Sequence, residues 1–256
     1  AIEREELVLH YQPKIDVRAA RMVGAEALMR WQRGDRLVPP SDFIPLAEET
    51  GLIVPIGEWV LRRACADTRK WHAAGFDHVS VAVNLSARQF RHGELIQTIR
   101  QALQDSGIAA RQLELEITES LLMDDTEASQ VALNDLKALG TSIFLDDFGT
   151  GYSSLAYLKK FPIDGLKIDR SFIRDLPGDP DDEAITHAIL ALSQALRLRV
   201  VAEGVENEAQ LEFLRRAGCS VVQGFYFSRP LVFDKFLEWL QRTTPARVGI
   251  AGSQTW

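Results

Sequence analysis

The chain has 256 residues, of which 46% are hydrophobic and 25% are charged, and its formal net charge is −7. This length provides a large core in one or two domains, and the negative charge argues against binding of nucleic-acid polymers, which need a basic surface. The two cysteines lie far apart, which argues against a disulfide framework or a zinc knuckle, and no apolar run approaches the ~20 residues that span a membrane. We therefore expect a globular domain of the cytoplasm.

Strand-like and helix-like segments alternate along the whole chain. The strands are predicted at residues 8–17, 21–31, 79–86, 113–120, 142–149, 165–172, 200–205 and 220–228. The helices are predicted at residues 43–51, 57–75, 93–107, 126–140, 153–161, 182–197, 207–218 and 233–242. This pattern favours a (β/α)8 TIM-like barrel over an open doubly wound sheet. The first two strands are joined too closely for a parallel crossover, so we expect an antiparallel first strand.

One domain is expected to cover residues 1–242, because no linker rich in Pro, Gly or Ser divides them. Residues 243–256 lack hydrophobic periodicity, and we expect them to form a disordered tail. A functional site must therefore lie within the barrel domain itself.

Almost every predicted strand carries a polar residue near its carboxyl end. These residues are Glu26, Asn84, Glu116, Asp146, Asp147, Lys167, Asp169, Glu203 and Gln223. One such residue alone is most often a helix cap or a turn residue. Their recurrence on successive strands favours a function, because the carboxyl ends of barrel strands converge on the face where active sites form.

The charges of this set indicate a metal site. Glu26, Glu116, Asp146, Asp147 and Glu203 carry five negative charges when ionised, and the lysine offsets one. Two divalent cations would cancel the remainder, and without them some of these acids must stay protonated. Carboxylate and amide oxygens without histidine favour Mg²⁺ or Mn²⁺, and two such ions are typical of phosphoester hydrolysis. A serine nucleophile is not favoured, because the sequence has no G-x-S-x-G motif.

Two adjacent acids end the predicted strand at residues 142–149, in the stretch FLDDFGTGYSS. Strand alternation points Asp146 and Asp147 to opposite faces, so a bend must bring Asp147 to the same site. We expect the following glycines, Gly149 and Gly151, to allow that bend, because glycine tolerates backbone angles that other residues resist. The loop beyond them is expected to be the moving part of the site.

These motifs together resemble the EAL domain family, the bacterial phosphodiesterases that hydrolyse cyclic di-GMP. The motif that gives the family its name is Glu26-Ala27-Leu28, and VNLS, LEITES, DDFGTGYSS, LKIDRSF, VVAEGVE and QGF follow in order at similar spacing. The resemblance runs from LVLHYQPKID to QGFYFSRPL, which is nearly the whole chain. The family fold is a (β/α)8 barrel with an antiparallel first strand, in agreement with the strand pattern.

The resemblance implies a role for each matching residue. Two Mg²⁺ or Mn²⁺ ions would be held by Glu26, Asn84, Glu116, Asp146, Asp147 and Glu203, with Asp146 bridging. Lys167 would orient the attacking water, and Glu203 would serve as general base. Arg30 would pair with a phosphate. The nucleotide would be contacted by Gln12, Leu28, Asp169 and Gln223, and the loop DFGTGYSS would be anchored by Glu119.

The implied reaction is hydrolysis of cyclic di-GMP to linear 5′-pGpG by a homodimer. The resemblance also implies that the chain is the C-terminal module of a larger signalling protein with GGDEF or sensory domains, with or without a membrane anchor. The motif set is complete, which favours an enzyme. The alternatives are a receptor that binds cyclic di-GMP without cleaving it, and a two-metal barrel hydrolase that acts on another phosphodiester.

Overall fold

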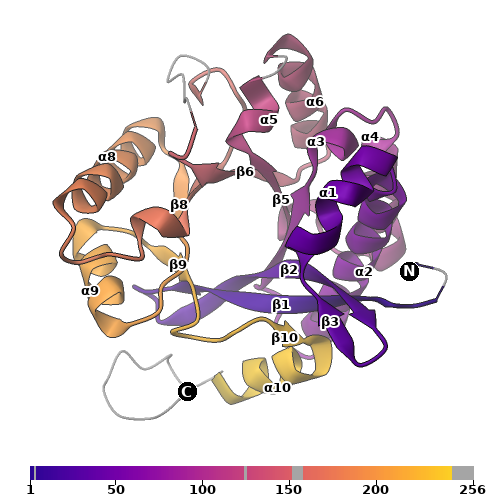
Figure 1. Cartoon of the computed structure of the whole chain (residues 1–256), viewed down its shortest axis with the longest axis horizontal. Helices are drawn as coiled ribbons and strands as arrows, with labels where there is room; N and C mark the ends of the chain where they lie inside the picture. Colours follow the sequence, from indigo (N-terminus) through magenta and orange to yellow (C-terminus); the bar gives the residue numbers. More distant parts are fainter. Residues whose placement is uncertain (3, 124–125, 152–157, 244–256) are drawn as a thin grey trace.

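A computed structural model describes residues 1–2, 4–123, 126–151 and 158–243. Eight strands close into a barrel, because the first strand pairs with both the second and the last (Figure 1). They are β1 (Leu7–Asp16), β2 (Arg21–Arg33), β4 (Ser80–Leu85), β5 (Leu113–Thr118), β6 (Ser142–Phe148), β7 (Gly165–Ile168), β8 (Arg199–Ala202) and β9 (Val221–Gln223). The predicted (β/α)8 barrel is confirmed.

Strand β1 runs antiparallel to both of its barrel neighbours, whereas the other barrel strands pair in parallel. Only residues 17–20 separate β1 from β2, and Asp16 Oδ1 accepts hydrogen bonds from the backbone N–H groups of Arg18 and Ala19 at 2.9 Å each. A hairpin turn of this length cannot carry the chain back across the barrel. The predicted antiparallel first strand is therefore confirmed, with its physical reason.

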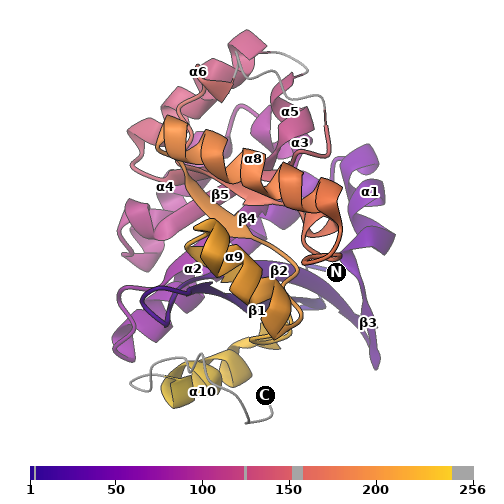
Figure 2. The same ribbon diagram turned by 90° about the vertical axis from the view of Figure 1, so that its left-hand side faces the viewer.

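Helices surround the barrel and cover the outer face of its strands (Figures 1 and 2). The longer ones are α1 (Pro40–Thr50), α2 (Ile53–Ala73), α4 (Leu95–Ser106), α6 (Thr126–Ala138), α8 (Pro180–Leu196), α9 (Glu208–Ala217) and α10 (Phe233–Thr243). Short turns are α3 (Ala87–Phe90), α5 (Glu119–Met123), η1 (Ala110–Gln112) and η2 (Arg170–Phe172). In the described part of the chain, no helix combines the length and apolar character that a membrane crossing requires.

Helix α9 begins and ends at residues that cap it. Asn207 and Gln210 form a reciprocal capping box at the start of α9, and Gly218 ends that helix in the left-handed region. Helix α1 begins earlier than predicted, at Pro40, because proline suits the first turn, where its missing N–H is not needed.

Several predicted strands are shorter in the structure. β7, β8 and β9 end at Ile168, Ala202 and Gln223, ahead of the predicted ends at residues 172, 205 and 228. After β8, Gly204 has a φ of 75°, and a side chain there would clash with Arg170. Two short strands were not predicted: β3 (Arg36–Val38) pairs with β2, and β10 (Leu231–Val232) pairs with β1.

Two predictions fall largely outside the described residues. The helix expected at residues 153–161 coincides mostly with 152–157, and only Leu158 of it is described as helical. Of the tail expected at 243–256, only Thr243 is described, as the last residue of α10.

The apolar core lies between the strands and the helices, and the barrel interior is polar at both ends. Along β5, Leu113, Leu115 and Ile117 are fully buried, while the alternate residues Glu114 and Glu116 face the barrel axis. The same alternation on β1 points Tyr11 outward, where its ring contacts those of Trp71 and Phe236, each at 5.4 Å. Strand alternation therefore separates an apolar outer face, which packs against the helices, from a polar inner face.

Candidate functional site

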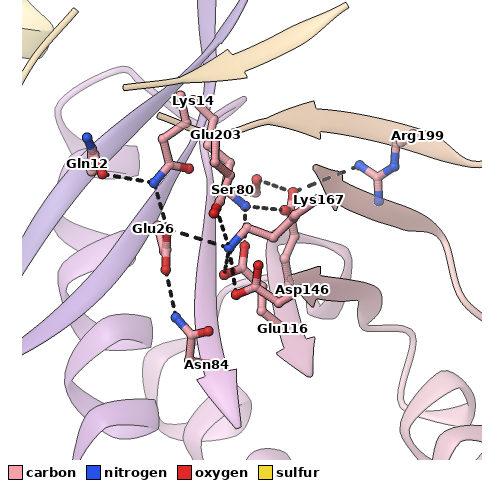
Figure 3. Close-up of polar contacts among 12 residues, drawn as sticks. Gln12, Lys14, Glu26, Ser80, Asn84, Glu116, Asp146, Lys167, Arg199 and Glu203 are labelled. Carbon is pink, nitrogen blue, oxygen red and sulfur yellow. Dashed lines mark hydrogen bonds and ion pairs between the residues drawn. The ribbon is translucent and has the colours of Figure 1, made fainter. Parts of the chain in front are cut away.

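Lys167 on β7 lies at the centre of a cluster of carboxylates at the carboxyl end of the barrel (Figure 3). Its Nζ is 2.6 Å from Glu116 Oε2, 2.7 Å from Glu203 Oε1, 3.0 Å from Asp146 Oδ2 and 3.7 Å from Glu26 Oε2. The ammonium is almost fully buried, at 1% exposure. Four acids from different strands or strand ends thus share one buried cation.

One lysine does not balance these acids. Burial raises the pKa of Glu203 to about 8, because Lys167 offsets only part of that cost while Asp146 and other acids repel the charged form. Burial likewise raises the pKa of Glu26 and that of Asp146. The structure therefore agrees with the expectation that, without metal, some of these acids resist ionisation.

Glu116 differs from the other acids of the cluster. Its two oxygens are divided between two lysines, with Lys14 Nζ at 2.7 Å from Oε1 and Lys167 Nζ at 2.6 Å from Oε2. Burial alone would raise the pKa of Glu116, but the two ammonium groups outweigh it and lower the pKa to about 2. Glu116 is thus an anion across the physiological pH range.

Amide side chains surround Glu26, which projects from the middle of β2. Asn84 Nδ2 donates to Glu26 Oε1 at 2.7 Å, and Gln223 Nε2 donates to Glu26 Oε2 at 2.6 Å and to Gln12 Oε1 at 3.0 Å. Glu26 is near the end of the barrel section of β2 rather than of the whole strand, since β2 pairs with β4 only from Gly24 to Ala27. The expectation that it lies at a strand end therefore holds only for the part of β2 that belongs to the barrel.

A bend separates the two adjacent aspartates of β6. Asp147 has a φ of 52°, and the pairing of β6 with β7 shifts register between Leu145 and Phe148. The predicted bend exists, and the expectation that the glycines provide it holds in part: Asp147 itself is left-handed, and Gly149, two positions later, also has a positive φ, of 97°. Aspartate tolerates this region better than most residues. Asp146 Oδ1 accepts the backbone N–H of Asp147 at 2.9 Å, which holds the bend.

Glu119 lies beside the start of the loop that follows β6. Its Oε2 accepts from the Gly149 backbone N–H at 3.5 Å, and the carboxylate is buried, at 4% exposure. A Cβ on Gly151 would approach Glu119 Oε1 to 3.5 Å. Glu119 thus lies beside the start of the loop, and its role as loop anchor stays a prediction, since residues 152–157 of the loop lie outside the described residues.

The remaining predicted substrate residues do not join the carboxylate cluster through direct contacts. Arg30 and Leu28 are partly buried on β2, and Arg30 Nη1 donates to the backbone oxygen of Met29 at 2.8 Å. Asp169 caps η2 and accepts from Ser171 through its backbone N–H at 2.9 Å and its hydroxyl at 2.5 Å. Their assignment to the nucleotide stays a prediction.

The sequence reasoning missed Lys14 and the partners of Glu114. Lys14 Nζ bonds Glu114 Oε2 at 3.0 Å as well as Glu116, and Ser80 Oγ donates to Glu114 Oε1 at 2.7 Å. Strand alternation offered a signal, because Lys14 is two residues after Gln12 and therefore on the same face of β1.

The donor set fits divalent cations, although its side chains are turned toward Lys167. The described residues contain no group of three or more His, Cys, Asp or Glu arranged as a ready metal site. The cluster nevertheless offers only oxygen donors and an excess of buried negative charge. Among the described residues, Gln223 Oε1 is buried without a hydrogen-bond partner, so it has an unused acceptor for a ligand.

Comparison with known proteins adds independent findings. The family model described as EAL domain matches residues 1–230. The chain is 52% identical over 238 residues to the bifunctional diguanylate cyclase/cyclic di-GMP phosphodiesterase MucR of Pseudomonas aeruginosa, covering 93% of this chain and 35% of MucR. It is 42% identical over 243 residues to the cyclic di-GMP phosphodiesterase PdeR of Escherichia coli, covering 94% of this chain and 36% of PdeR.

Among solved structures, that of the PaMucR phosphodiesterase in complex with c-di-GMP is similar, with a TM-score of 0.89 and 52% identity. The match covers 92% of this chain and 96% of that one. The chain spans about a third of the length of the curated relatives described above.

Proposed function

The chain belongs to the EAL domain family, and from this premise we propose that it hydrolyses cyclic di-GMP to linear 5′-pGpG with the help of two divalent metal ions. The relatives named as cyclic di-GMP phosphodiesterases support the reaction class and the substrate. The similarity to a phosphodiesterase solved with c-di-GMP supports the same site.

One observation carries the proposal, namely the buried carboxylate cluster with a single lysine at its centre. A structural ion-pair network would balance its charges, but this one leaves Glu26, Asp146 and Glu203 with raised pKa values. Divalent cations restore the balance and favour the ionised acids. Because a phosphodiester is itself an anion, this carboxylate cluster can bind it only when cations offset the repulsion between the two.

We assign the ligand roles to the side chains in and around the cluster: Glu26, Asn84, Glu116, Asp146, Asp147 and Glu203. EAL phosphodiesterases depend on divalent metal, and we propose Mg²⁺ or Mn²⁺ because the donors are hard oxygens. When bound, such ions lower the pKa of a water and stabilise charge on the phosphate. The protein's own contribution is to hold the donors and to exclude bulk water.

Lys167 and Glu203 act on the attacking water in this proposal. The lysine Nζ and the Glu203 carboxylate are 2.7 Å apart, so both reach the same small volume at the mouth. Lys167 orients the water through an N–H, and Glu203 accepts its proton.

Substrate contacts complete the proposal. Gln12 and Gln223 are bonded to each other within reach of Glu26, and Gln223 Oε1 has an unused acceptor for an N–H of a base. The guanidinium of Arg30 matches the geometry of a phosphate. Leu28 and Asp169 are assigned to the nucleotide, and Glu119 to the loop, by the family motifs. A homodimer and a larger parent chain belong to the same proposal, the latter supported by the greater length of the relatives.

The test is turnover of cyclic di-GMP by the purified chain in Mg²⁺ or Mn²⁺, with pGpG followed by chromatography over a range of protein concentrations. We expect pGpG with at least one metal, no product in EDTA, and a rate per chain that rises with concentration if dimerisation controls it. The variant Glu26→Ala is expected to lose turnover.

Three outcomes would contradict parts of the proposal. Tight binding without product in either metal identifies a receptor instead of an enzyme. Cyclic di-GMP that is neither bound nor cleaved, with another diester cleaved, identifies a different hydrolase. Normal turnover by Glu26→Ala refutes the ligand assignment.

A further inference from the structure

Each of the two carboxylate oxygens of Glu116 accepts a hydrogen bond from a different lysine. Its Oε1 accepts from Lys14 at 2.7 Å and its Oε2 accepts from Lys167 at 2.6 Å, with Glu116 itself at 0% exposure. The two lysines therefore approach this carboxylate from different strands, β1 and β7 (Figure 3). Neither oxygen can move without breaking a charge-assisted hydrogen bond.

Lys14 is itself fixed in place. Its side chain is 2% exposed and its Nζ also bonds Glu114 Oε2 at 3.0 Å, while Glu114 accepts from Ser80 Oγ at 2.7 Å. The ring of Phe144 lies 5.5 Å from the ammonium. This arrangement gives Lys14 one orientation, directed at Glu116.

Lys14 is too deep to meet the substrate. It contributes to the lining of a cavity of about 460 Å³ that also touches Glu114, Ser80 and Arg199, at the amino end of the barrel. The acids Glu26, Asp146 and Glu203 all lie on the other side of Glu116, around Lys167. Any effect of Lys14 on the reaction must therefore pass through Glu116.

We infer that Lys14 is a positioning residue, which orients Glu116 from the amino end of the barrel and thereby sets both the metal-binding oxygen of Glu116 and the place of Lys167. The inference rests on the proposed function. Partners that orient a metal-ligating side chain typically affect metal affinity or activity by ~10–100-fold.

The experiment compares Lys14→Met with Glu114→Gln. Lys14→Met removes the hydrogen bond to Glu116 but keeps the length of the side chain. Glu114→Gln is the matched control, because it removes the charge of the same buried ion pair at the same depth, while the glutamine amide oxygen can still accept from Lys14 Nζ and keep it directed at Glu116. The readouts are calorimetric titration of Mn²⁺ into EDTA-treated, dialysed protein without nucleotide, and separate kcat and KM values for cyclic di-GMP.

We expect Lys14→Met to weaken Mn²⁺ affinity and to lower kcat, each by about tenfold or more, with KM unchanged. Glu114→Gln is expected to lower the melting temperature and to keep Mn²⁺ affinity and kcat. If Lys14→Met does not fold because Glu114 is left unpaired, the double variant Lys14→Met/Glu114→Gln removes that charge and is expected to show the same losses.

Equal Mn²⁺ affinity and kcat in the lysine variant and in the control would overturn the inference. A wild-type chain that binds Mn²⁺ without cleaving cyclic di-GMP would refute the proposed function, and the Mn²⁺ titrations would still decide the role of Lys14. A wild-type chain that binds no Mn²⁺ would refute both.

Discussion

The two ends of the barrel interior use the same kinds of side chain with opposite charge balance. At the amino end, burial would raise the pKa of Glu114, but Lys14, Ser80 and Arg199 outweigh it and lower the pKa. At the carboxyl end, burial raises the pKa of Glu203 to about 8 despite the contact with Lys167. A buried glutamate is thus stabilised as an anion at one end and destabilised at the other.

This difference separates a structural network from a functional one. A buried ion pair with its partners satisfied is part of the folded framework, whereas buried acids without enough cations to balance them are typical of functional sites. Glu116 connects the two networks, because it accepts from Lys14 of the structural network at the amino end and from Lys167 of the functional network at the carboxyl end. Variants on the two sides should therefore fail in different ways.

Glu203→Gln gives the largest expected effect and tests the functional end. The change removes the proposed base and a metal ligand, so we expect kcat to fall on the order of 10³-fold, within the range for loss of a general base. Product formation with Mn²⁺ measures it. Glu114→Gln, at the other end, is the control and should keep its turnover. Comparable losses in both variants would contradict the division between the two ends.

The same variant should make the metal-free protein more stable. The pKa of Glu203 in the folded state, about 8, is raised above its ordinary value of 4.5, so this group contributes stability below pH 4.5 and loses it as pH rises toward 8. Glutamine removes that loss. In EDTA at pH 8 we expect a melting temperature at least about 2 °C above wild type. A lower melting temperature at that pH would show that the ionised Glu203 carboxylate does not destabilise the folded protein.

Asp67→Ala tests a buried acid of α2 that contacts the outer face of β1, where basic residues balance its charge. Asp67 Oδ2 accepts from Tyr11 Oη at 2.9 Å and from Arg63 Nε at 2.8 Å, and Oδ1 accepts from Lys70 at 2.8 Å. We expect a loss of about 2 kcal/mol in the free energy of unfolding, the scale for leaving a buried donor, here the Tyr11 hydroxyl, without its acceptor. Chemical denaturation measures it. Turnover per folded molecule should stay at the wild-type rate, and a large fall in kcat would mean that this network also reaches the site.

The sequence predicted the barrel and the acids of the site for a simple physical reason. Strand alternation and the recurrence of polar residues at strand ends are local patterns, and they placed Glu116, Lys167 and Glu203 on the same face of the barrel. The antiparallel first strand also followed from a local quantity, the length of the connection between β1 and β2.

Other features depend on packing that no local pattern contains. The partners of Lys14 come from β5, which is distant in sequence, and only barrel closure brings them together. The backbone of Asp147 adopts a φ of 52° although glycines follow it, because Asp146 holds the turn through a side-chain hydrogen bond. The arrangement of Glu116, Asp146 and Glu203 around Lys167 likewise follows from the register of β5, β6, β7 and β8.

Glu119→Ala tests whether the functional end extends into the loop after β6. The carboxylate accepts from the Gly149 backbone N–H at 3.5 Å, and it is not placed among the metal ligands. We expect kcat and Mn²⁺ affinity to fall by about tenfold, because an outer partner of the site is lost. Kinetics and metal titration measure the two effects. Unchanged values in both would reduce the segment GTGYSS to a simple connection.

The two cysteines give the smallest expected effect, and they test whether the apolar core around the barrel is independent of its polar interior. Burial raises the pKa of Cys65 and of Cys219 to about 12 each, so neither thiol forms the reactive anion at neutral pH. We expect no labelling by a thiol reagent in the native protein at pH 8, and labelling of both thiols in denaturant. Labelling should remain absent in Glu203→Gln, because a change among the polar side chains inside the barrel leaves the cysteines buried in the apolar core. Rapid labelling of that variant would instead show that the substitution inside the barrel also opens the apolar core between the strands and the helices.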